Sequence, residues 1–342
     1  MKWVTVVLAV VTAVTAKTAV WTERIHFTDR TYNNLEVIVD LASTDSFLIE
    51  GRCENCPFRG INRRFYPEKS STFEKAGGRF GQKFDEDLNI AQGGISGYIG
   101  EDLVGSSKTL RGKFGLVKRL DGTFDPATTL EAERVAGRIG LSLNTSSDMN
   151  LLEHYFEGVS RKLVCFAPKC VENSNKVDEC QTILFKGQFP VDGYENYTAA
   201  RVEDSRSGLW QFKVDSFKGP SVQAHSFNAI LSTTTPDLVV PKDVYEAFST
   251  HFNVRQDEND RTVDCRHRYE TSPVVVTVNR VEMPIQARDL ISYDIWTKTC
   301  SLRVRPAENL DRNTWIFGSV FTDSVGICLD FDERNINFLK VL

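Results

Sequence analysis

The most informative stretch of the chain is Val37-Ile38-Val39-Asp40-Leu41-Ala42-Ser43-Thr44-Asp45-Ser46-Phe47-Leu48-Ile49. An apolar β-branched run comes first, followed by a single acid, small residues and a second apolar run. This pattern predicts a buried strand that delivers Asp40 to a tight turn, followed by another strand. Because a buried carboxylate is costly unless it is hydrogen-bonded or used in chemistry, this stretch raises the question of whether Asp40 has a partner.

Length and composition narrow the class of protein. The 342 residues suffice for two domains of ordinary size, and 41% hydrophobic with 25% charged residues is typical of soluble globular proteins. The formal net charge of -5 gives no basic footprint, which argues against a nucleic-acid partner. No cluster of Lys and Arg indicates binding to a membrane surface.

The first 16 residues are expected to be a signal peptide. Met1-Lys2-Trp3 is a short basic start, and residues 4–14 form an apolar run too short to span a bilayer. Val14-Thr15-Ala16 offers small residues for cleavage, and a signal anchor is the less favoured alternative. We therefore predict a secreted, extracellular protein, with a lysosomal or other endomembrane lumen as the variant, and no membrane anchor.

Eight cysteines fit a secretory route, which permits disulfides. The even count suits four bridges, although the spacing alone leaves 105 pairings open. Cys53 and Cys56 form a CxxC pair without a second CxxC or a His pair at metal spacing, so a small disulfide loop is favoured over a zinc site. No metal and no cofactor are expected. Two Asn-x-Ser/Thr sequons, at Asn144 and Asn196, are candidate glycosylation sites.

Most of the remaining segments predict strands, because they are short, β-branched or aromatic, and bounded by Gly, Asp, Asn and Pro. Helical patterns are few, and the best cover residues 150–163, 241–252 and 287–291. We expect a β-dominated protein with small helices. The predicted strands cover residues 36–39, 47–49, 79–84, 97–103, 182–185, 209–217, 274–278 and 327–331.

A faint internal repeat runs through the chain. Residues 37–43 resemble residues 229–235, and residues 135–141 resemble residues 315–321. In the second pair, apolar residues flank a glycine, which suits a strand whose backbone approaches another segment closely. The repeat predicts two lobes of similar build, with a boundary near residues 189–200.

In their order and spacing these motifs resemble the pepsin-like aspartic peptidases over nearly all of the mature chain. The Asp-Thr-Gly-Ser motif of the N-terminal lobe is Asp40-Leu41-Ala42-Ser43 here, and Ser232-Thr233-Thr234-Thr235 stands where the second Asp-Thr-Gly motif belongs. The resemblance implies an all-β, bilobal fold of two β-barrel-like lobes with a cleft between them, residues 17–190 and 191–342 forming one peptidase-like unit. Further family segments match residues 66–73, 114–117, 137–141, 209–212, 315–321 and 331–335.

The resemblance also exposes a missing catalytic group. The family requires one carboxylate from each lobe, and the two share a proton because like charges so close cannot both ionise. One carboxylate then acts as the base on a water molecule. Ser232 occupies the second position, and a hydroxyl can neither hold that proton near working pH nor supply the charge. We expect Asp40 to be a remnant of the catalytic pair and Ser232 to be a satisfied turn hydroxyl.

The residues that support the catalytic pair in the family are altered as well. Ala42 and Thr234 replace motif glycines, and Leu41 replaces a threonine that braces the two loops, whereas Thr233 retains it. Residues 84–87, Phe-Asp-Glu-Asp, align with the active-site flap but lack its tyrosine hydroxyl and its glycines. The predicted cleft and flap residues are Ser43, Phe84, Asp85, Thr233 and Thr235.

The disulfide pattern is partly implied by the resemblance. Cys53–Cys56 corresponds to a small loop of the N-terminal lobe, and Cys265–Cys300 corresponds to a large loop of the C-terminal lobe. The other four cysteines are additional, and our hypothesis pairs Cys170 with Cys180 and Cys165 with Cys328. Only residues 17–25 separate the expected signal peptide from the family's first mature strand, so no basic inhibitory prosegment is expected.

Three interpretations of function remain open. The first is a catalytically inactive, degenerate family member whose cleft holds a peptide or protein ligand. The second is an active acid endopeptidase of the aspartic type with a remodelled site, which Asp40 alone supports. The third is a stable extracellular β protein whose cleft has no role. We favour the first and third, and we expect a monomer.

Overall fold

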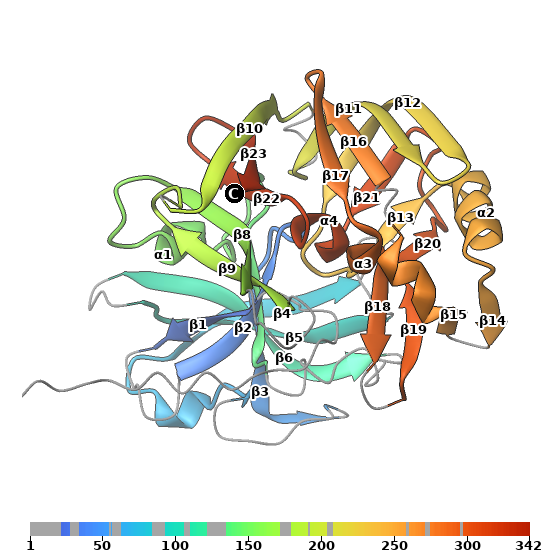
Figure 1. Ribbon diagram of the computed structural model, residues 1–342. Coiled ribbons are helices and arrows are strands. Elements are labelled where there is room, and N and C mark those ends of the chain that lie inside the picture. The colour runs from blue at the N-terminus through green and yellow to red at the C-terminus, as the bar shows by residue number, and fades with distance from the viewer. Residues whose placement is uncertain are drawn as a thin grey trace, which may run out of the picture.

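The computed structural model describes residues 22–27, 34–54, 56, 63–83, 93–105, 110–121, 135–171, 179–190, 192–203, 208–257, 260–270, 274–294 and 297–342. The expected signal peptide and the flap residues 84–87 lie outside these ranges. Within the described ranges the chain forms four β-sheets and four short α-helices (Figure 1). The mostly-β fold expected from the sequence is confirmed.

A seven-stranded sheet contains the first part of the chain, at the bottom of Figure 1. Its strand β2 ends at Asp40, residues 41–42 form a turn, and β3 follows, as the opening stretch predicted. Strand β7 lies between them, parallel to β2 and antiparallel to β3. In sheet order the strands are β1 (Thr22–His26), β2 (Asn34–Asp40), β7 (Gly137–Gly140), β3 (Phe47–Glu54), β6 (Arg111–Asp121), β5 (Gly94–Leu103) and β4 (Glu74–Lys83).

A second seven-stranded sheet repeats this plan in the last part of the chain. Strand β21 lies parallel to β12 and antiparallel to β13, which matches the positions of β7, β2 and β3. The internal repeat seen in the sequence is therefore a repeat of strand arrangement. In sheet order the strands are β17 (Val281–Ile285), β16 (Val274–Val278), β11 (Gln211–Gly219), β12 (Val222–Leu231), β21 (Thr314–Phe317), β13 (Leu238–Val240) and β20 (Val304–Pro306).

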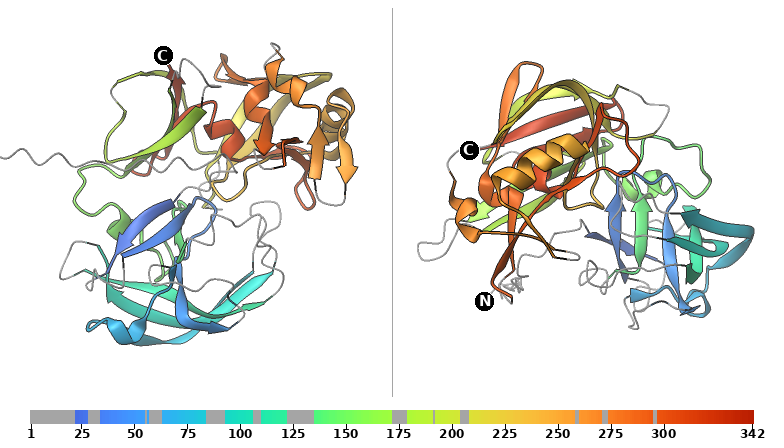
Figure 2. Two further views of the ribbon diagram at one scale, coloured as in Figure 1. Left: turned by 60° about the horizontal axis from the view of Figure 1, so that its bottom comes forward. Right: turned by 90° about the vertical axis from the view of Figure 1, so that its right-hand side faces the viewer.

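A five-stranded sheet takes strands from both parts of the chain. The expected boundary at residues 190/191 falls between its strands β9 and β10. Figure 2 shows the first sheet, in blue and teal, as a body separate from the yellow-to-red strands of the second. In sheet order the shared strands are β10 (Tyr194–Arg201), β23 (Asn335–Val341), β22 (Gly326–Asp330), β8 (Leu163–Val171) and β9 (Glu179–Lys186).

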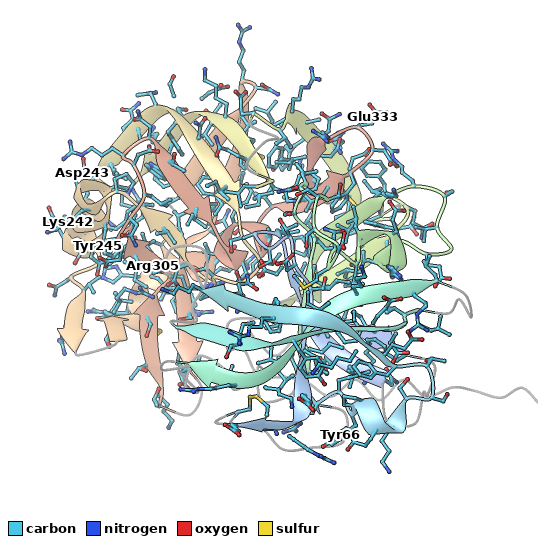
Figure 3. All side chains as sticks on the ribbon, turned by 180° about the vertical axis from the view of Figure 1, so that it is seen from behind. Tyr66, Lys242, Asp243, Tyr245, Arg305 and Glu333 are labelled. Atoms are coloured by element: carbon cyan, nitrogen blue, oxygen red, sulfur yellow. A yellow bond between two sulfur atoms is a disulfide. The ribbon has the colours of Figure 1, made fainter. Side chains whose placement is uncertain are left out.

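The fourth sheet is small and lies beside helices of the C-terminal part. Its strands are β14 (Arg255–Asp257), β15 (Asp260–Val263), β19 (Thr299–Leu302) and β18 (Ile291–Asp294). The nearby helices are α2 (Lys242–His251), the 3-10 helix η4 (Cys265–Tyr269), α3 (Ala287–Leu290) and α4 (Ser319–Thr322). Helix α2 contacts β20, and Figure 3 shows Lys242, Asp243 and Tyr245 of the helix beside Arg305 of that strand.

Aromatic side chains fill the core of the C-terminal part. Trp315 is 1% exposed, and its ring stacks on Phe227 with 4.1 Å between centroids. Trp210 is fully buried and meets Phe331 edge-on at 4.8 Å. Such pairs add about 0.5–1.5 kcal/mol each beyond the area that they bury.

One predicted helix is wrong in length. We expected a helix over residues 150–163, but α1 spans only Leu152–Tyr155, and β8 already begins at Leu163. Gly158 has a φ of +79°, a conformation that ends a right-handed helix and that glycine adopts without strain. The helices predicted over residues 241–252 and 287–291 are present as α2 and α3.

Three of the four expected disulfides are present among the described side chains. They are Cys53–Cys56, Cys165–Cys328 and Cys265–Cys300. The bridge between Cys165 and Cys328 joins facing residues of β8 and β22. Cys170 and Cys180 face each other in the backbone register of β8 and β9, while their side chains lie outside the described part.

Candidate functional site

The two motif loops lie against each other and are joined by one threonine. Thr233 Oγ1 donates a hydrogen bond to the carbonyl oxygen of Val39 (2.5 Å) and accepts one from the backbone N–H of Leu41 (3.2 Å). Both contacts are buried, so they are protected from competition with water. The reciprocal bond cannot form, because Leu41 has no hydroxyl and instead lies in the hydrophobic core. The brace between the loops is therefore one-sided.

Asp40 has a partner, and it is an arginine. The Asp40 residue is fully buried, and its Oδ2 lies 3.1 Å from Nη1 of Arg138. Its Oδ1 accepts a hydrogen bond from the backbone N–H of Ala42 at 2.9 Å. The Arg138 side chain is 5% exposed, so both charges of this ion pair are withdrawn from water.

The strand register explains why Arg138 reaches Asp40. In the parallel pair of β2 and β7, Ile38 lies opposite Arg138 and Asp40 lies opposite Gly140. Both charged residues therefore lie on neighbouring strands within two positions of each other. A buried ion pair is tolerated only when its geometry and its additional hydrogen bonds offset desolvation, and here the Ala42 N–H supplies one such bond.

Ser232 is satisfied by the turn in which it lies. The residue is 2% exposed, and its hydroxyl lies 3.2 Å from the hydroxyl of Thr234. The backbone N–H of Thr234 donates to Ser232 Oγ at 3.3 Å. The backbone N–H of Ser232 donates to the carbonyl of Phe317 on β21. The Ser232 hydroxyl and N–H are therefore hydrogen-bonded within the turn and to β21.

Equivalent glycines bring the two loops close to their neighbouring strands. A Cβ atom at Gly140 would lie 2.5 Å from the carbonyl oxygen of Ser43. A Cβ atom at Gly318 would lie 2.3 Å from the carbonyl oxygen of Thr235. Contacts this short are not tolerated, so each position needs glycine. The close approach that the sequence predicted for both repeats is confirmed.

The other predicted cleft residues divide into described and undescribed ones. Ser43 is 6% exposed, and its Oγ accepts a hydrogen bond from Nε2 of Gln82 at 3.2 Å. Gln82 belongs to β4, which precedes the predicted flap, so this bond ties β4 to the Asp40 loop. Thr235 is 1% exposed, and its hydroxyl makes no hydrogen bond with the described residues. Phe84 and Asp85 lie outside the described residues.

The sequence interpretation missed a second charged cluster next to the Ser232 loop. Asp237 is 4% exposed, and its Oδ2 lies 2.7 Å from Nη2 of Arg261 and 3.8 Å from Nε of Arg305. Arg303 donates from Nη2 to the hydroxyl of Ser319 at 2.7 Å. The available signal was an acid directly before the short apolar strand β13, which is similar to the position of Asp40 at the end of the apolar strand β2.

Arg138 was also missed, although a signal existed. The sequence Gly137-Arg138-Ile139-Gly140-Leu141 was interpreted only as a core strand, and every residue of β7 is indeed buried. An arginine is rarely buried unless it is paired. Its presence in such a strand should have pointed to a buried acid nearby.

The remaining site predictions concern modification, metals and membranes. Asn196 is exposed on β10, whereas Asn144 is partly buried and its Oδ1 accepts a hydrogen bond from Ser146 N–H at 3.0 Å. Glycosylation of either residue stays a prediction. Among the described residues, no three or more His, Cys, Asp or Glu side chains are grouped as metal ligands would be. The same part of the chain has no helix long and apolar enough to cross a membrane.

Known proteins with similar sequences cover most of this chain. The family model described as eukaryotic aspartyl protease matches residues 30–341. The chain is 25% identical to Pepsin-3 of Oryctolagus cuniculus, covering 83% of this chain and 72% of that protein. It is 22% identical to Pepsin-2B of Gadus morhua (89% and 91% covered) and 25% identical to Pregnancy-associated glycoprotein 1 of Sus scrofa (83% and 72% covered). The resemblance seen in the motifs is confirmed, and the chain belongs to the eukaryotic aspartyl protease family, with pepsins among its relatives.

Proposed function

We propose that this protein is a secreted, catalytically inactive pepsin-like homologue that holds a peptide or protein ligand between lobes formed by residues 17–190 and 191–342. The observation that carries the proposal is the ion pair between Asp40 and Arg138, at the position where an active family member needs a free carboxylate.

The chemistry of the site supports inactivity. An aspartic peptidase needs two carboxylates, one to take a proton from water and one to give a proton to the substrate carbonyl. Here Asp40 Oδ2 contacts the Arg138 guanidinium, and Oδ1 accepts the Ala42 N–H. Ser232 offers a hydroxyl that already contacts Thr234. Neither side chain is left in a state suited to activating water.

Features outside the carboxylates support a binding role. Thr233 still joins the two motif loops, and Gln82 still ties β4 to the Asp40 loop. These contacts preserve the architecture around the former catalytic position while the catalytic groups are changed. A protein that holds a ligand without cutting it would need that architecture and no proton transfer.

The alternative is an active acid endopeptidase with a remodelled site. Family membership and the retained Asp40 favour it. It requires the Arg138 ion pair to open during turnover and another group to replace the second carboxylate. The Ser232 hydroxyl contacts the hydroxyl and the backbone N–H of Thr234, neither of which is an acid.

Activity is tested first. Residues 17–342 are purified and incubated with an unfolded protein substrate from acid to neutral pH, with and without an inhibitor of aspartic peptidases. We expect no inhibitor-sensitive cleavage. Inhibitor-sensitive turnover that disappears in Asp40→Ala would overturn the proposal, and an Asp332→Ala variant, altered at an exposed residue of the β22–β23 turn, controls for the substitution.

Binding is tested separately, so that inactivity and ligand binding can fail independently. The purified chain is mixed with a pool of extended peptides, and hydrogen–deuterium exchange is followed in the backbone of residues 40–44 and 232–235. We expect slower exchange at both segments with the pool. If no peptide protects either segment, the third interpretation, a β protein without a cleft function, replaces the binding proposal.

A further inference from the structure

Two histidines from different elements converge on one carboxylate in the C-terminal part. His251 is the last residue of α2, His267 lies in η4, and Glu270 follows η4 directly. His251 Nε2 donates to Glu270 Oε2 at 3.3 Å, and His267 Nδ1 donates to Glu270 Oε1. Each carboxylate oxygen therefore accepts one imidazole N–H.

The cluster is close to solvent but rests on the core. The side chains of His251, His267 and Glu270 are 31%, 25% and 31% exposed, so solvent protons reach them. Phe252 is 1% exposed, and its ring meets His251 at 4.8 Å and His267 at 5.3 Å between centroids. The two imidazoles are 6.3 Å apart by centroid. The buried phenyl ring thus holds both histidines in place under the carboxylate.

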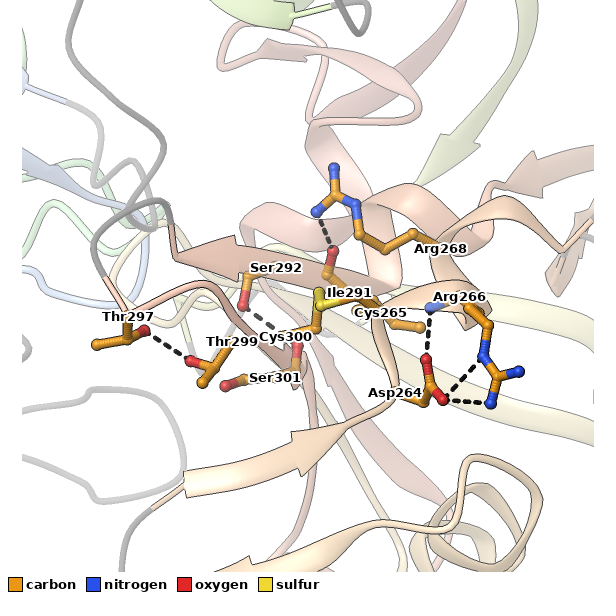
Figure 4. Close-up of a disulfide and its surroundings, with 10 residues drawn as sticks. All are labelled: Asp264, Cys265, Arg266, Arg268, Ile291, Ser292, Thr297, Thr299, Cys300 and Ser301. Carbon is orange, nitrogen blue, oxygen red and sulfur yellow. Dashed lines mark hydrogen bonds and ion pairs between the residues drawn. A yellow bond between two sulfur atoms is a disulfide. The ribbon is translucent and has the colours of Figure 1, made fainter.

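Among the charged residues described near the cluster, Glu270 is the one hydrogen-bonded to both histidines, and the others have different partners. Partial burial acts to raise the pKa of Glu270, but the hydrogen bonds from His267 and His251 outweigh it and lower that pKa. Asp264 is paired with Arg266, whose hydrogen bonds lower the Asp264 pKa to about 2, and Arg268 donates to the carbonyl of Ile291 (Figure 4). The packed helix α3 contributes the charged residues Arg288 and Asp289.

We propose that His251, Glu270 and His267 form a proton-operated clamp that fastens the end of α2 to η4 at mildly acid pH. Protonation turns each hydrogen bond from a neutral imidazole to the Glu270 carboxylate into a hydrogen-bonded ion pair, which is stronger. It also places a positive charge at the C-terminal end of α2, where the helix dipole favours a cation. The exposed Tyr269, 71% accessible, lies between His267 and Glu270 in the sequence.

The sign of the pH dependence follows from the charges. Histidine side chains ordinarily take up protons near pH 6.5, and carboxylates near pH 4. Because the pKa of Glu270 is lowered, its charge persists into more acid solution than usual. The clamp therefore stabilises in the interval between these two titrations. In this proposal the clamp is absent above the pH at which a histidine ordinarily holds its proton, and it is lost again as pH falls and Glu270 is protonated.

The first test compares thermal unfolding of the full mature chain at pH 5.5 and pH 8.0, in EDTA to exclude metal binding. We expect Glu270→Gln to lower the midpoint at both pH values, and by about 2 °C more at pH 5.5, where the ion pairs are lost as well as the hydrogen bonds. His225→Gln removes an exposed histidine on β12 and serves as the matched control, with no change at either pH. An equal loss at both pH values in Glu270→Gln would overturn the clamp.

A double-mutant cycle separates the clamp from a general loss of structure. His251→Gln, Glu270→Gln and the double variant are compared at both pH values. We expect the two single shifts to be strongly non-additive at pH 5.5, because either change removes the same ion pair, and closer to additive at pH 8.0, where only a hydrogen bond couples the two residues. Additive shifts at pH 5.5 would show that His251 and Glu270 act independently and would refute the proposal.

Discussion

The two repeats differ in how they treat one buried position. In the first, β2 ends in Asp40, and the neighbouring strand β7 places Arg138 opposite Ile38. In the second, β12 is followed by Ser232, and β21 places Ile316 opposite Ile230. Arg138 and Ile316 thus occupy equivalent positions. Where the acid is kept, the neighbouring strand supplies a cation, and where it is lost, the neighbouring strand is apolar.

This difference shows that the desolvation cost of the buried Asp40 carboxylate is offset by a cation from the same repeat. The acid of an active family member would be balanced by its counterpart in the other lobe through a shared proton. Here each repeat is balanced within itself, by Arg138 for Asp40 and by hydroxyl contacts for Ser232. Asp40 and Ser232 are thus held by separate contacts, and the Thr233 brace joins their two loops.

The largest loss of stability is expected when Arg138 is replaced by isoleucine, the residue at the equivalent position 316 of the second repeat. Arg138→Ile leaves the fully buried Asp40 carboxylate without its cation, which should cost about 3–5 kcal/mol in the free energy of unfolding. Urea unfolding near neutral pH measures it. Arg266→Ile, at a side chain 91% exposed, is the control and should leave the midpoint unchanged. A loss below about 1 kcal/mol would mean that the ion pair does not balance Asp40.

Completing the exchange should reverse most of that loss. Asp40→Ser combined with Arg138→Ile makes the first repeat chemically similar to the second and removes both buried charges. Because a buried ion pair contributes little net stability relative to uncharged replacements, we expect stability within about 1–2 kcal/mol of the wild type. The same urea series tests this. If the double variant is no more stable than Arg138→Ile alone, the two residues do not act as a pair.

The brace between the repeats is expected to matter less than the ion pair. Thr233→Val keeps the shape of the side chain but removes both hydrogen bonds, leaving the Val39 carbonyl and the Leu41 N–H unsatisfied. We expect a loss of about 2 kcal/mol in unfolding free energy. Thr235→Val is the matched control, because that buried hydroxyl makes no hydrogen bond with the described residues, and it should be neutral. Equal losses in both variants would contradict a specific role for Thr233.

The smallest effect is expected from restoring only the missing acid. Ser232→Asp should leave turnover at the background of the peptidase assay, because Arg138 still engages Asp40 and Leu41 still lacks a bracing hydroxyl. Adding Arg138→Ile to Ser232→Asp frees Asp40 and tests which obstacle dominates. Robust cleavage by the single variant, abolished by the inhibitor, would show that the surrounding residues matter less than the acid itself.

Local sequence patterns predicted the parts of the fold that depend on neighbouring residues. The β-branched run before Asp40 predicted the strand and the turn that are present. The recurrence of this pattern at residues 229–235 predicted the repeated strand arrangement of the second seven-stranded sheet. Gly140 and Gly318 marked close approaches because a side chain there would meet backbone within 3 Å. The prediction of a helix over residues 150–163 was wrong because it relied on apolar spacing alone. It neglected Gly158, whose positive φ is incompatible with a continuous right-handed helix.

The features that were missed depend on contacts between distant segments. Arg138 reaches Asp40 only through the parallel register of β2 and β7, which a single sequence does not specify. His251 and His267 meet only because α2 and η4 pack against the same Phe252 ring. In both cases the residue types were visible and their partners were not. A buried charge in an apolar strand remains a useful warning that such a partner exists.

The bridge between Cys165 and Cys328 makes most of the C-terminal part a covalently closed circle. It spans 163 residues and also encloses the Cys265–Cys300 bridge. A single peptide-bond cleavage anywhere between residues 165 and 328 would therefore leave both fragments attached to each other. A nicked molecule would migrate as one species until a reductant is added, so a first cut by a peptidase would not release a piece of the chain.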